Sequence, residues 1–238
     1  MNVVRRPNVH TVMPIEVTQL TEKDIPGAIE CIQIAFAGDP YNKWIFNDQH
    51  KFSLQRNSVS LGIRCRWGMK YALFHVAKDT NDASGKVLGV ACWLAPSNPF
   101  APQTWSDYFG SWQLWFEQVK MNLWYGRGGL NVKRYYIWKS AQADAQKALW
   151  DDKKGYFFCN IVTVLPETQG KGIGKLLFKQ VTDQADAEGR KCYLESSRAE
   201  PNMAIYERMG FQLAKEMTCD DEGDAIKLYC MMRGPSQR

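Results

Sequence analysis

Residues 164–175 read Val-Leu-Pro-Glu-Thr-Gln-Gly-Lys-Gly-Ile-Gly-Lys, and this stretch decides the fold. An apolar, strand-like run ends at Leu165, glycine occupies positions 170, 172 and 174, and a helical pattern of apolar residues follows from Lys175 onward. Glycine has no Cβ and lets the backbone approach a ligand closely, while the N–H groups and dipole at a helix start attract an anion. The stretch therefore predicts a strand, a phosphate-binding loop and a helix, in that order.

Two well-known phosphate loops do not match this stretch. A P-loop has Gly-x-x-x-x-Gly-Lys followed by Ser or Thr. Here Leu176 follows Gly174 and Lys175, and Gln169 occupies the position of the first glycine. The dinucleotide-binding motif is Gly-x-Gly-x-x-Gly, whereas residues 170–174 read Gly-x-Gly-x-Gly. Neither a nucleoside triphosphate nor a nicotinamide dinucleotide is therefore predicted, and an ordinary glycine-rich turn remains the alternative to a ligand loop.

The composition is that of an ordinary globular protein. A chain of 238 residues suits one large domain or one domain with an insertion. Hydrophobic residues make up 45% and charged residues 23%, which is within the usual range of soluble domains. The formal net charge is +5. Because the positive charges are scattered, we interpret them as a solvated surface that helps to attract an anionic cosubstrate, and we expect no nucleic-acid partner.

The seven cysteines do not form a pattern that is typical of disulfides or zinc. Their number is odd, they are widely spaced and none belongs to a Cys-x-x-Cys pair, which favours a reducing compartment and no metal. No stretch reaches the roughly 20 apolar residues that span a bilayer, and the N-terminus lacks the apolar core of a signal peptide. We therefore expect a cytoplasmic protein without a membrane partner.

The first hundred residues predict a strand, two helices and a hairpin. Residues 15–20 alternate apolar and polar as a half-buried strand does, and residues 24–37 carry apolar residues at helical spacing after a capping pattern. A second helix is expected over residues 50–68. Two strand-like runs, 71–76 and 87–94, flank a polar turn and predict a hairpin.

Residues 103–150 form a distinct block that is rich in aromatic residues. These recur at helical spacing over residues 105–119, and a further helix is expected over 132–150 after a glycine-rich break. One interpretation makes both aromatic stripes part of the core. The other makes part of them the lining of a pocket for an apolar or aromatic ligand, with Trp112 and Trp115 as candidate contacts.

The last part of the chain alternates strands and helices around the glycine loop. Residues 156–164 are the most strand-like run of the sequence and lead directly into the loop. The elements expected after the loop are a helix over 172–187, a short strand over 191–195, a short helix over 202–209 and a hairpin of 211–217 with 225–232.

Two motifs of this part stand in a fixed order. The strand ends in Val164-x-Pro-x-x-Gln169-Gly-x-Gly-x-Gly174, and further on the chain reads Asn202-Met-Ala-Ile-Tyr206-Glu-Arg-Met-Gly-Phe. The arrangement resembles the GNAT superfamily of acyl-CoA-dependent N-acetyltransferases. The first motif is similar to that family's Gln/Arg-x-x-Gly-x-Gly/Ala pyrophosphate motif, and the second to its Asn…Tyr-Glu-x-x-Gly-Phe segment. The N-terminal elements are similar to the family's β-α-α-β-β opening.

The resemblance implies an α/β (α+β) GNAT fold. This fold has a single mixed central sheet with one splayed strand pair and helices on both faces, here with an aromatic-rich helical insertion. We expect one acetyltransferase domain over residues 1–238, with a loose tail at 1–13. The insertion at 101–154 is expected on the acceptor side, and the acetyl-CoA-binding core over 156–217. Members of the family are often dimers, so a homodimer is left open.

The resemblance assigns the glycine loop to acetyl-CoA as cosubstrate. Backbone N–H groups of the loop are expected to hold the CoA pyrophosphate, with a lysine at the helix start. The splayed strand is expected to present its backbone to the pantetheine arm, which Asn202 also contacts. The expected CoA contacts are Ile161, Val162, Val164, Gln169, Gly170, Lys171, Gly172, Ile173, Gly174, Lys175, Asn202 and Tyr206.

The resemblance also implies a direct transfer of acetyl to an amine, in which a tyrosine protonates the leaving thiolate. Tyr206 matches that tyrosine. Its phenol, with an ordinary pKa of about 10, suits a thiolate whose thiol has a pKa of about 8–9; a buried helix aromatic is the alternative. Glu195 ends the strand expected to flank the acetyl group and is the first candidate base. A structural carboxylate that caps the following loop is the alternative there.

The acceptor side is less defined by the sequence. Asp39 and Tyr41 follow the first helix, where the family's acceptor pocket usually forms, and we predict both as substrate contacts; a turn-forming Asp-Pro and a packed tyrosine are the alternatives. Cys159 and Asn160 could flank the site from the central strand, although an acyl-cysteine is unusual in the family. The three histidines lie outside the motifs.

Further cues resemble the small-molecule branch that includes puromycin N-acetyltransferase. They are Ala-Phe-Ala-x-x-Pro at 35–40, Leu-Glu-Ser-Ser at 194–197 and Tyr-Glu-Arg-Met-Gly-Phe at 206–211, whereas the longer, tryptophan-rich insertion departs from that branch. We expect acetylation of a primary amine on a small metabolite, xenobiotic or antibiotic. The alternatives are a protein N-terminal or lysine acetyltransferase, which needs an open peptide groove, and a CoA-binding domain without turnover, which would lose the tyrosine.

Overall fold

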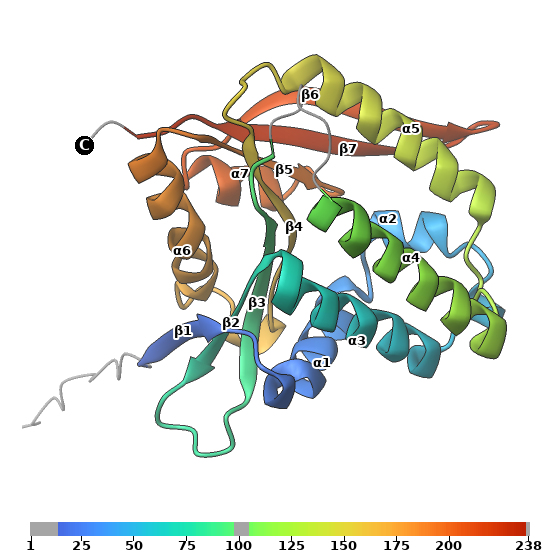
Figure 1. The fold of residues 1–238 in the computed structure, drawn as a ribbon, viewed down its shortest axis with the longest axis horizontal. Helices are drawn as coiled ribbons and strands as arrows, with labels where there is room; N and C mark the ends of the chain where they lie inside the picture. Colours follow the sequence, from blue (N-terminus) through green and yellow to red (C-terminus); the bar gives the residue numbers. More distant parts are fainter. Residues whose placement is uncertain (1–13, 98–104, 237–238) are drawn as a thin grey trace, which may run out of the picture.

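A computed structural model describes residues 14–97 and 105–236 of the chain. Within these ranges one sheet has helices on both of its faces (Figure 1). Its strands are β1 (Ile15–Gln19), β2 (Leu73–Asp79), β3 (Val87–Leu94), β4 (Tyr156–Val164), β5 (Lys191–Ser196), β6 (Gln212–Asp221) and β7 (Asp224–Arg233). The tail expected at residues 1–13 lies outside the described residues.

The α-helices of the described ranges are α1 (Ile25–Phe36), α2 (Pro40–Ile45), α3 (Leu54–Tyr71), α4 (Trp105–Tyr125), α5 (Val132–Leu149), α6 (Ile173–Glu188) and α7 (Asn202–Glu207). Short 3-10 helices occur at η1 (Glu22–Asp24), η2 (Gln49–Lys51) and η3 (Pro166–Thr168). The expected elements occur in the expected order. The expected mixed sheet with helices on both faces is confirmed, and α2 is a short helix in addition to the expected ones.

The sheet has the strand order β1-β2-β3-β4-β5-β7-β6. Neighbouring strands run antiparallel, except β4 and β5, which pair in parallel. A parallel pair needs a long crossover between its strands, and α6 supplies it. The connection from β4 to α6 therefore starts at the carboxyl end of a central strand, where ligands commonly bind in sheets of this kind.

The pairing of β4 with β5 stops halfway along β4. It runs from Tyr156 opposite Lys191 to Cys159 opposite Leu194. Beyond this point β4 continues to Val164 in pairing with β3, while β5 pairs with β7. The two strands therefore separate toward the glycine loop, as the expected splayed pair does.

A bulge in β4 accompanies this separation. Trp93 of β3 pairs with Cys159, but the next residue back, Cys92, pairs with Ile161. Asn160 is thus the extra residue between two ladder positions. A bulge bends its strand and increases the local twist, which turns the second half of β4 away from β5.

The helices divide between the two faces of the sheet. α1 and α3 contact β2, β3 and β4 on one face, whereas α6 contacts β1 to β5 on the other (Figure 1). α5 lies over β6 and contacts α2, and α4 packs on α3. The block between β3 and β4 thus forms two helices with different neighbours: α4 packs on α3, and α5 packs on β6 and α2.

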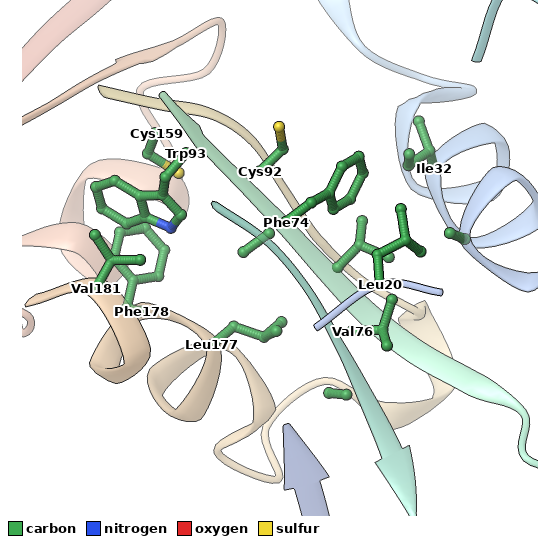
Figure 2. Packing of buried hydrophobic residues seen from close by; sticks show 14 of the residues in the cluster. Leu20, Ile32, Phe74, Val76, Cys92, Trp93, Cys159, Leu177, Phe178 and Val181 are labelled. Carbon is green, nitrogen blue, oxygen red and sulfur yellow. The ribbon is translucent and has the colours of Figure 1, made fainter. Parts of the chain in front are cut away.

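Two hydrophobic clusters fill the interior. The larger one joins β2, β3 and β4 to α1, α3 and α6. Figure 2 shows part of it, with Trp93 beside Phe178 and Val181, and Ile32 on the other side of β3. The rings of Trp93 and Phe178 meet edge to face, with centroids 5.3 Å apart. The smaller cluster packs α2 and α5 on β5, β6 and β7.

The aromatic stripe of α4 is not core. Its buried face holds Gly110 and Met121, and α4 meets α3 there; for example, Trp67 Nε1 of α3 donates to the Gly110 carbonyl at 2.9 Å. The opposite face exposes Trp112 and Trp115 to 52% and 57%. The interpretation of both stripes as core is therefore wrong for α4. On α5 it is correct in part, because Tyr135, Ile137 and Trp138 pack against the smaller cluster.

Within the described ranges, no helix has both the length and the apolar character that a bilayer crossing requires.

Replacing Trp93 with alanine should lower the free energy of unfolding by about 3–5 kcal/mol, because a large, fully buried side chain leaves a cavity. Urea denaturation followed by circular dichroism measures this change. Trp124, which is 80% exposed, provides the matched control, and its alanine variant should stay within about 0.5 kcal/mol of the wild type. Equal losses in the two variants would contradict this account of the core.

Candidate active site

The glycine loop connects the carboxyl end of β4 to the start of α6. Gly170 and Gly172 have φ angles of +78° and +82°, a conformation that strains residues with a Cβ. A Cβ added at either position would meet nothing within 4 Å, so the space above the loop is open. Gly172 is also the N-cap of α6, and the first N–H groups of a helix have no partner inside it. The loop and the first turn can therefore bind an anion.

The remaining residues of the predicted CoA set surround this loop. Gln169, Lys171 and Lys175 are exposed on it, while Ile173 is buried beneath it. Gln169 Nε2 donates to the Val164 carbonyl at 3.2 Å and ties the loop to the end of β4. The structure thus brings the loop residues of the predicted set together at one end of one strand.

The separated half of β4 adds a second binding element. Ile161 and Val162 are half-buried there, beyond the last residue pair that β4 shares with β5. Backbone N–H and C=O groups need partners, and a strand edge can pair with an extended ligand by main-chain hydrogen bonds. The gap between the strands therefore suits a narrow, amide-containing chain.

Tyr206 and Asn202 lie on α7, beside the end of β5. The Tyr206 ring packs against Phe178, with centroids 5.7 Å apart. Burial raises the pKa of Tyr206, and the nearby Cys159 and Asp39 side chains raise it further. The phenol is therefore protonated at neutral pH. Asn202 Nδ2 donates to Ser196 Oγ at 3.1 Å, which fixes α7 to the end of β5.

Glu195 lies on β5 and faces α5. Its Oε2 accepts a hydrogen bond from Gln142 Nε2 at 2.8 Å, and its Oε1 accepts one from the Tyr193 hydroxyl at 2.9 Å. Burial raises the pKa of Glu195 above its ordinary value, against the opposing effects of these hydrogen bonds and of the Lys139 ammonium. Both partners lie on α5 and β5, so the carboxylate is not a cap for the loop after it. A buried carboxylate with a raised pKa is suited to accept a proton near neutral pH.

Asp39 joins the start of α2 to the loop after β5. Its Oδ1 accepts a hydrogen bond from the Asn42 backbone N–H at 2.9 Å, which makes it the N-cap of α2. Its Oδ2 accepts a hydrogen bond from the Ser197 hydroxyl. Asp39 is thus a buried, turn-forming residue, and its contact with a substrate stays a prediction.

A cavity of about 390 Å³ lies between α3, α4, α5 and the first half of β4. Its lining includes Gln142, which holds Glu195 in place, and Asn160, the bulged residue of β4. Aromatic side chains form much of the wall, and the cations Arg64 and Lys139 also reach it; the aromatic members are Tyr135, Trp138, Trp150, Tyr156 and Phe158. The candidate base therefore lies behind the wall of a pocket large enough for a small organic molecule, since such pockets hold about 300–1,000 Å³.

The other predicted substrate contacts lie around this cavity and do not line it. Tyr41 packs behind the wall against Trp138, with ring centroids 5.2 Å apart, and burial raises its pKa. Trp112 and Trp115 lie on the exposed face of α4, where their rings meet at 5.4 Å. From α4 it is Leu114 that reaches the cavity. These three contacts stay predictions.

Arg64, Lys139 and Gln142 are the residues that sequence reasoning missed. They come from α3 and α5 and meet at the cavity although more than 70 residues separate Arg64 from Lys139 in the chain. No local motif marks them. The one available signal is that Gln142 interrupts the apolar side of a predicted helix, where a buried amide needs a partner.

Cysteine and metal chemistry find little support in the described part of the chain. Burial raises the pKa of the Cys159 thiol well above its ordinary value, so the thiol stays protonated and is a poor nucleophile. In the same ranges, no group of three or more His, Cys, Asp and Glu side chains is arranged to hold a metal ion.

Residues 135–213 match the family model described as Acetyltransferase (GNAT) domain. The matched segment contains β4, the glycine loop, α6, β5 and α7, and it also includes α5 from Tyr135 onward. This segment is therefore similar to a GNAT acetyltransferase domain, and the chain is an enzyme of the acetyltransferase class.

Solved structures of similar fold extend over almost the whole chain. One from Corynebacterium glutamicum, described as histone acetyltransferase HPA2 and related acetyltransferase, has a TM-score of 0.56 and 18% identity over 94% of this chain and 98% of that one. Arylalkylamine N-acetyltransferase 2 from Aedes aegypti has a TM-score of 0.56 and 16% identity over 94% of this chain and 100% of that one. The ribosomal-protein-S18-alanine N-acetyltransferase from Escherichia coli has a TM-score of 0.51 and 13% identity over 94% of this chain and 96% of that one. At these identities the likeness concerns the fold.

The partly buried Glu195 carboxylate should make the protein less stable as the pH rises. Its pKa is higher in the folded state than in the unfolded state, where it is near 4.5, so the folded state binds more protons between the two values. The free energy of unfolding then falls through this window, by at most about 1.4 kcal/mol per pH unit. In Glu195→Gln this contribution should be absent, and the variant should be the more stable protein at neutral pH.

Urea denaturation of wild type and Glu195→Gln at half-unit steps from pH 4.5 to 8 measures this difference. Glu16→Gln, at an exposed glutamate of β1, controls for the loss of one charge and should track the wild type. A constant offset between wild type and Glu195→Gln across the whole range would show that burial does not shift the carboxyl's titration.

Proposed function

We propose that the enzyme transfers an acetyl group from acetyl-CoA to a primary amine of a small metabolite, xenobiotic or antibiotic. The observation that carries this proposal is the position of Glu195. Its carboxylate is held by Gln142, and Gln142 lines a cavity of about 390 Å³. The puromycin N-acetyltransferase-like branch remains our preferred relationship, and the whole of residues 1–238 our proposed single domain.

The glycine loop and the separated half of β4 fit acetyl-CoA as the donor. The space over Gly170 and Gly172 is open to a ligand, and the N-terminus of α6 favours a phosphate. Ile161, Val162 and Val164 would offer their backbone to the pantetheine arm, and Asn202 would contact the same arm. When bound, acetyl-CoA supplies the acetyl group as a thioester, which an amine attacks directly.

Two side chains of this chain are proposed to move the protons. Glu195 accepts a proton from the acceptor ammonium, directly or through a water, so that the nitrogen has a free lone pair. The N–C bond forms as the C–S bond breaks, and Tyr206 donates its phenolic proton to the sulfur of the departing CoA. Its raised pKa keeps that proton in place until the sulfur carries negative charge.

A protein N-terminal or lysine acetyltransferase is the second candidate. Similar folds belong both to enzymes named for a small amine, such as the arylalkylamine enzyme, and to enzymes named for a protein, such as the ribosomal-protein enzyme. A peptide needs an open groove, whereas the cavity beside Gln142 is bordered by α3, α4 and α5. This enclosure favours a small acceptor. A CoA-binding domain without turnover is disfavoured by the presence of Tyr206.

We propose a cytoplasmic setting from the cysteines. All seven are unpaired and buried, which supports a reducing location. No nucleic acid or membrane is needed as a partner, and a homodimer is compatible with the proposed reaction.

Release of CoA thiol with acetyl-CoA and a panel of acceptors tests the function. We expect turnover with small primary amines, at a kcat/KM at least about tenfold above that for peptides with free N-termini or lysines, because the cavity has the size of a small-molecule pocket. Mass spectrometry should find the acetyl group on the amine. Turnover of peptides alone would reject the small-molecule proposal, and CoA binding without any turnover would favour the non-catalytic alternative.

Tyr206→Phe should lower kcat about 100-fold or more, the usual contribution of a positioned proton donor. Because the ring is kept, the KM for acetyl-CoA should change by less than about threefold. Tyr136→Phe, at an exposed tyrosine of α5, should have wild-type kinetics. An unchanged kcat and pH profile in Tyr206→Phe would leave the donor role without support.

A further inference from the structure

We propose that the acceptor carries an anionic group, such as a carboxylate, together with its amine, and that Arg64 and Lys139 bind this group. The inference rests on the proposed acetylation of a small amine and narrows its substrate class. It assigns a specificity role to two side chains that no motif of the sequence marks.

The first observation is that both cations face one cavity. Arg64 reaches it from α3 and Lys139 from α5. Although the Lys139 side chain is largely exposed, its Nζ lies at the wall, donating to Gln142 Oε1 at 3.3 Å and lying 5.0 Å from the centre of the Trp138 ring. Two positive groups from different helices thus converge on the space proposed for the acceptor.

The second observation is that neither cation is neutralised. Among the residues that the structure describes, no carboxylate lies within ion-pair distance of Arg64 or Lys139, although many other basic residues of the chain have such partners. The carboxylate of Glu195 is near, but Gln142 and Tyr193 take its hydrogen bonds. The cavity wall therefore has an excess of positive charge.

The pKa of Lys139 reflects this excess of positive charge. Desolvation at the wall lowers its pKa, and the positive charge of Arg64 lowers it further, against the attraction of Glu195. Two like charges at one pocket repel each other, and a bound anion removes that repulsion. Arg64 is suited to this role because a guanidinium can bind a carboxylate with two parallel hydrogen bonds.

These cations are not placed for the CoA pyrophosphate. The cavity reaches β4 at Tyr156, Phe158 and Asn160, whereas the glycine loop begins after Leu165. With a rise of about 3.3 Å per strand residue, Asn160 and Leu165 are about 16 Å apart along the strand. The anion at Arg64 and Lys139 therefore belongs to the acceptor.

The other residues of the cavity wall indicate which chemical groups the acceptor carries besides its anion. Trp138, Trp150 and Phe158 give it an aromatic lining, and Gln142 marks the side on which the amine approaches Glu195. A compound with an aromatic ring, an ammonium group and a carboxylate matches all three parts. An aromatic amino acid is the simplest compound of this class.

Matched amine pairs test the inference. We would measure kcat/KM at saturating acetyl-CoA for tryptophan against tryptamine and for phenylalanine against phenethylamine, with wild type, Arg64→Gln and Lys139→Gln. The wild type should prefer the carboxylate-bearing member of each pair. Arg64→Gln should lower kcat/KM for that member about tenfold to 100-fold, mainly through KM, since a charge-assisted hydrogen bond is lost. The same substitution should change kcat/KM for the decarboxylated member by less than about threefold.

Arg66→Gln is the matched control, because Arg66 is exposed on the same helix, pairs with Glu22 and does not line the cavity. It should leave all four values unchanged. A wild-type preference for the decarboxylated amines, or an equal loss on both members of a pair in Arg64→Gln, would overturn the inference.

Binding of an anion without an amine separates the two proposals. Calorimetry with 3-indolepropionate should give binding to wild type that Arg64→Gln weakens about tenfold or more, and no such effect for Arg66→Gln. This result, combined with no turnover of any amine, would reject the proposed function and keep the anion site. Absence of this binding in wild type, combined with turnover of the decarboxylated amines, would reject the anion site and keep the function.

Discussion

The site depends on one interruption of backbone pairing. β4 and β5 are paired up to Cys159 and Leu194 and separate beyond them, and the bulge at Asn160 turns β4 away from its neighbour. Below this point the two strands belong to the core. Above it, β4 keeps only one partner strand and leaves backbone groups for a ligand. The glycine loop follows the end of β4, so this local irregularity places the gap next to the loop that we propose for the CoA pyrophosphate.

Two neighbouring residues of β5, both close to the proposed site, have side chains on opposite faces of the sheet. Successive side chains of a strand point to opposite faces. Glu195 therefore faces α5, where Gln142 holds its carboxylate, while Ser196 faces the other way and accepts a hydrogen bond from Asn202 of α7. The acceptor side and the donor side are thus neighbouring positions of one strand, with the gap between β4 and β5 beside them. Shifting β5 by one residue would exchange the two sides, so its pairing with β7 is as important to the proposed reaction as the side chains themselves.

The sequence predicted the elements around the glycine loop much better than those around the cavity, and the reason is physical. A phosphate loop, a helix start and a capping pattern are made by residues that are close in the chain, so Gly170, Gly172 and the bounds of α6 could be read directly. The cavity is made by Arg64, Lys139 and Phe158, which meet only through tertiary packing. Amphipathic spacing located α4 correctly but not the direction of its aromatic face, because periodicity defines a stripe without defining what covers it. Trp112 and Trp115 are the clearest example: their spacing suggested a lining, and they lie exposed.

Because the two halves of the site come from different parts of the chain, the fold does not determine which acceptor is used. The glycine loop, β4 and α7 form a compact unit within a short stretch of sequence, and a donor common to many enzymes constrains them together. The proposed acceptor cavity is bordered by α3, α4 and α5, which come from other parts of the chain. Substitutions at Arg64 or Lys139 can change the charge of the pocket while the bulge, the gap and the loop stay as they are. Structures that share the fold at 13–18% identity are accordingly named for acceptors as different as an arylalkylamine and a ribosomal protein. The charge of the cavity wall is therefore a better guide to the acceptor of this chain than the fold.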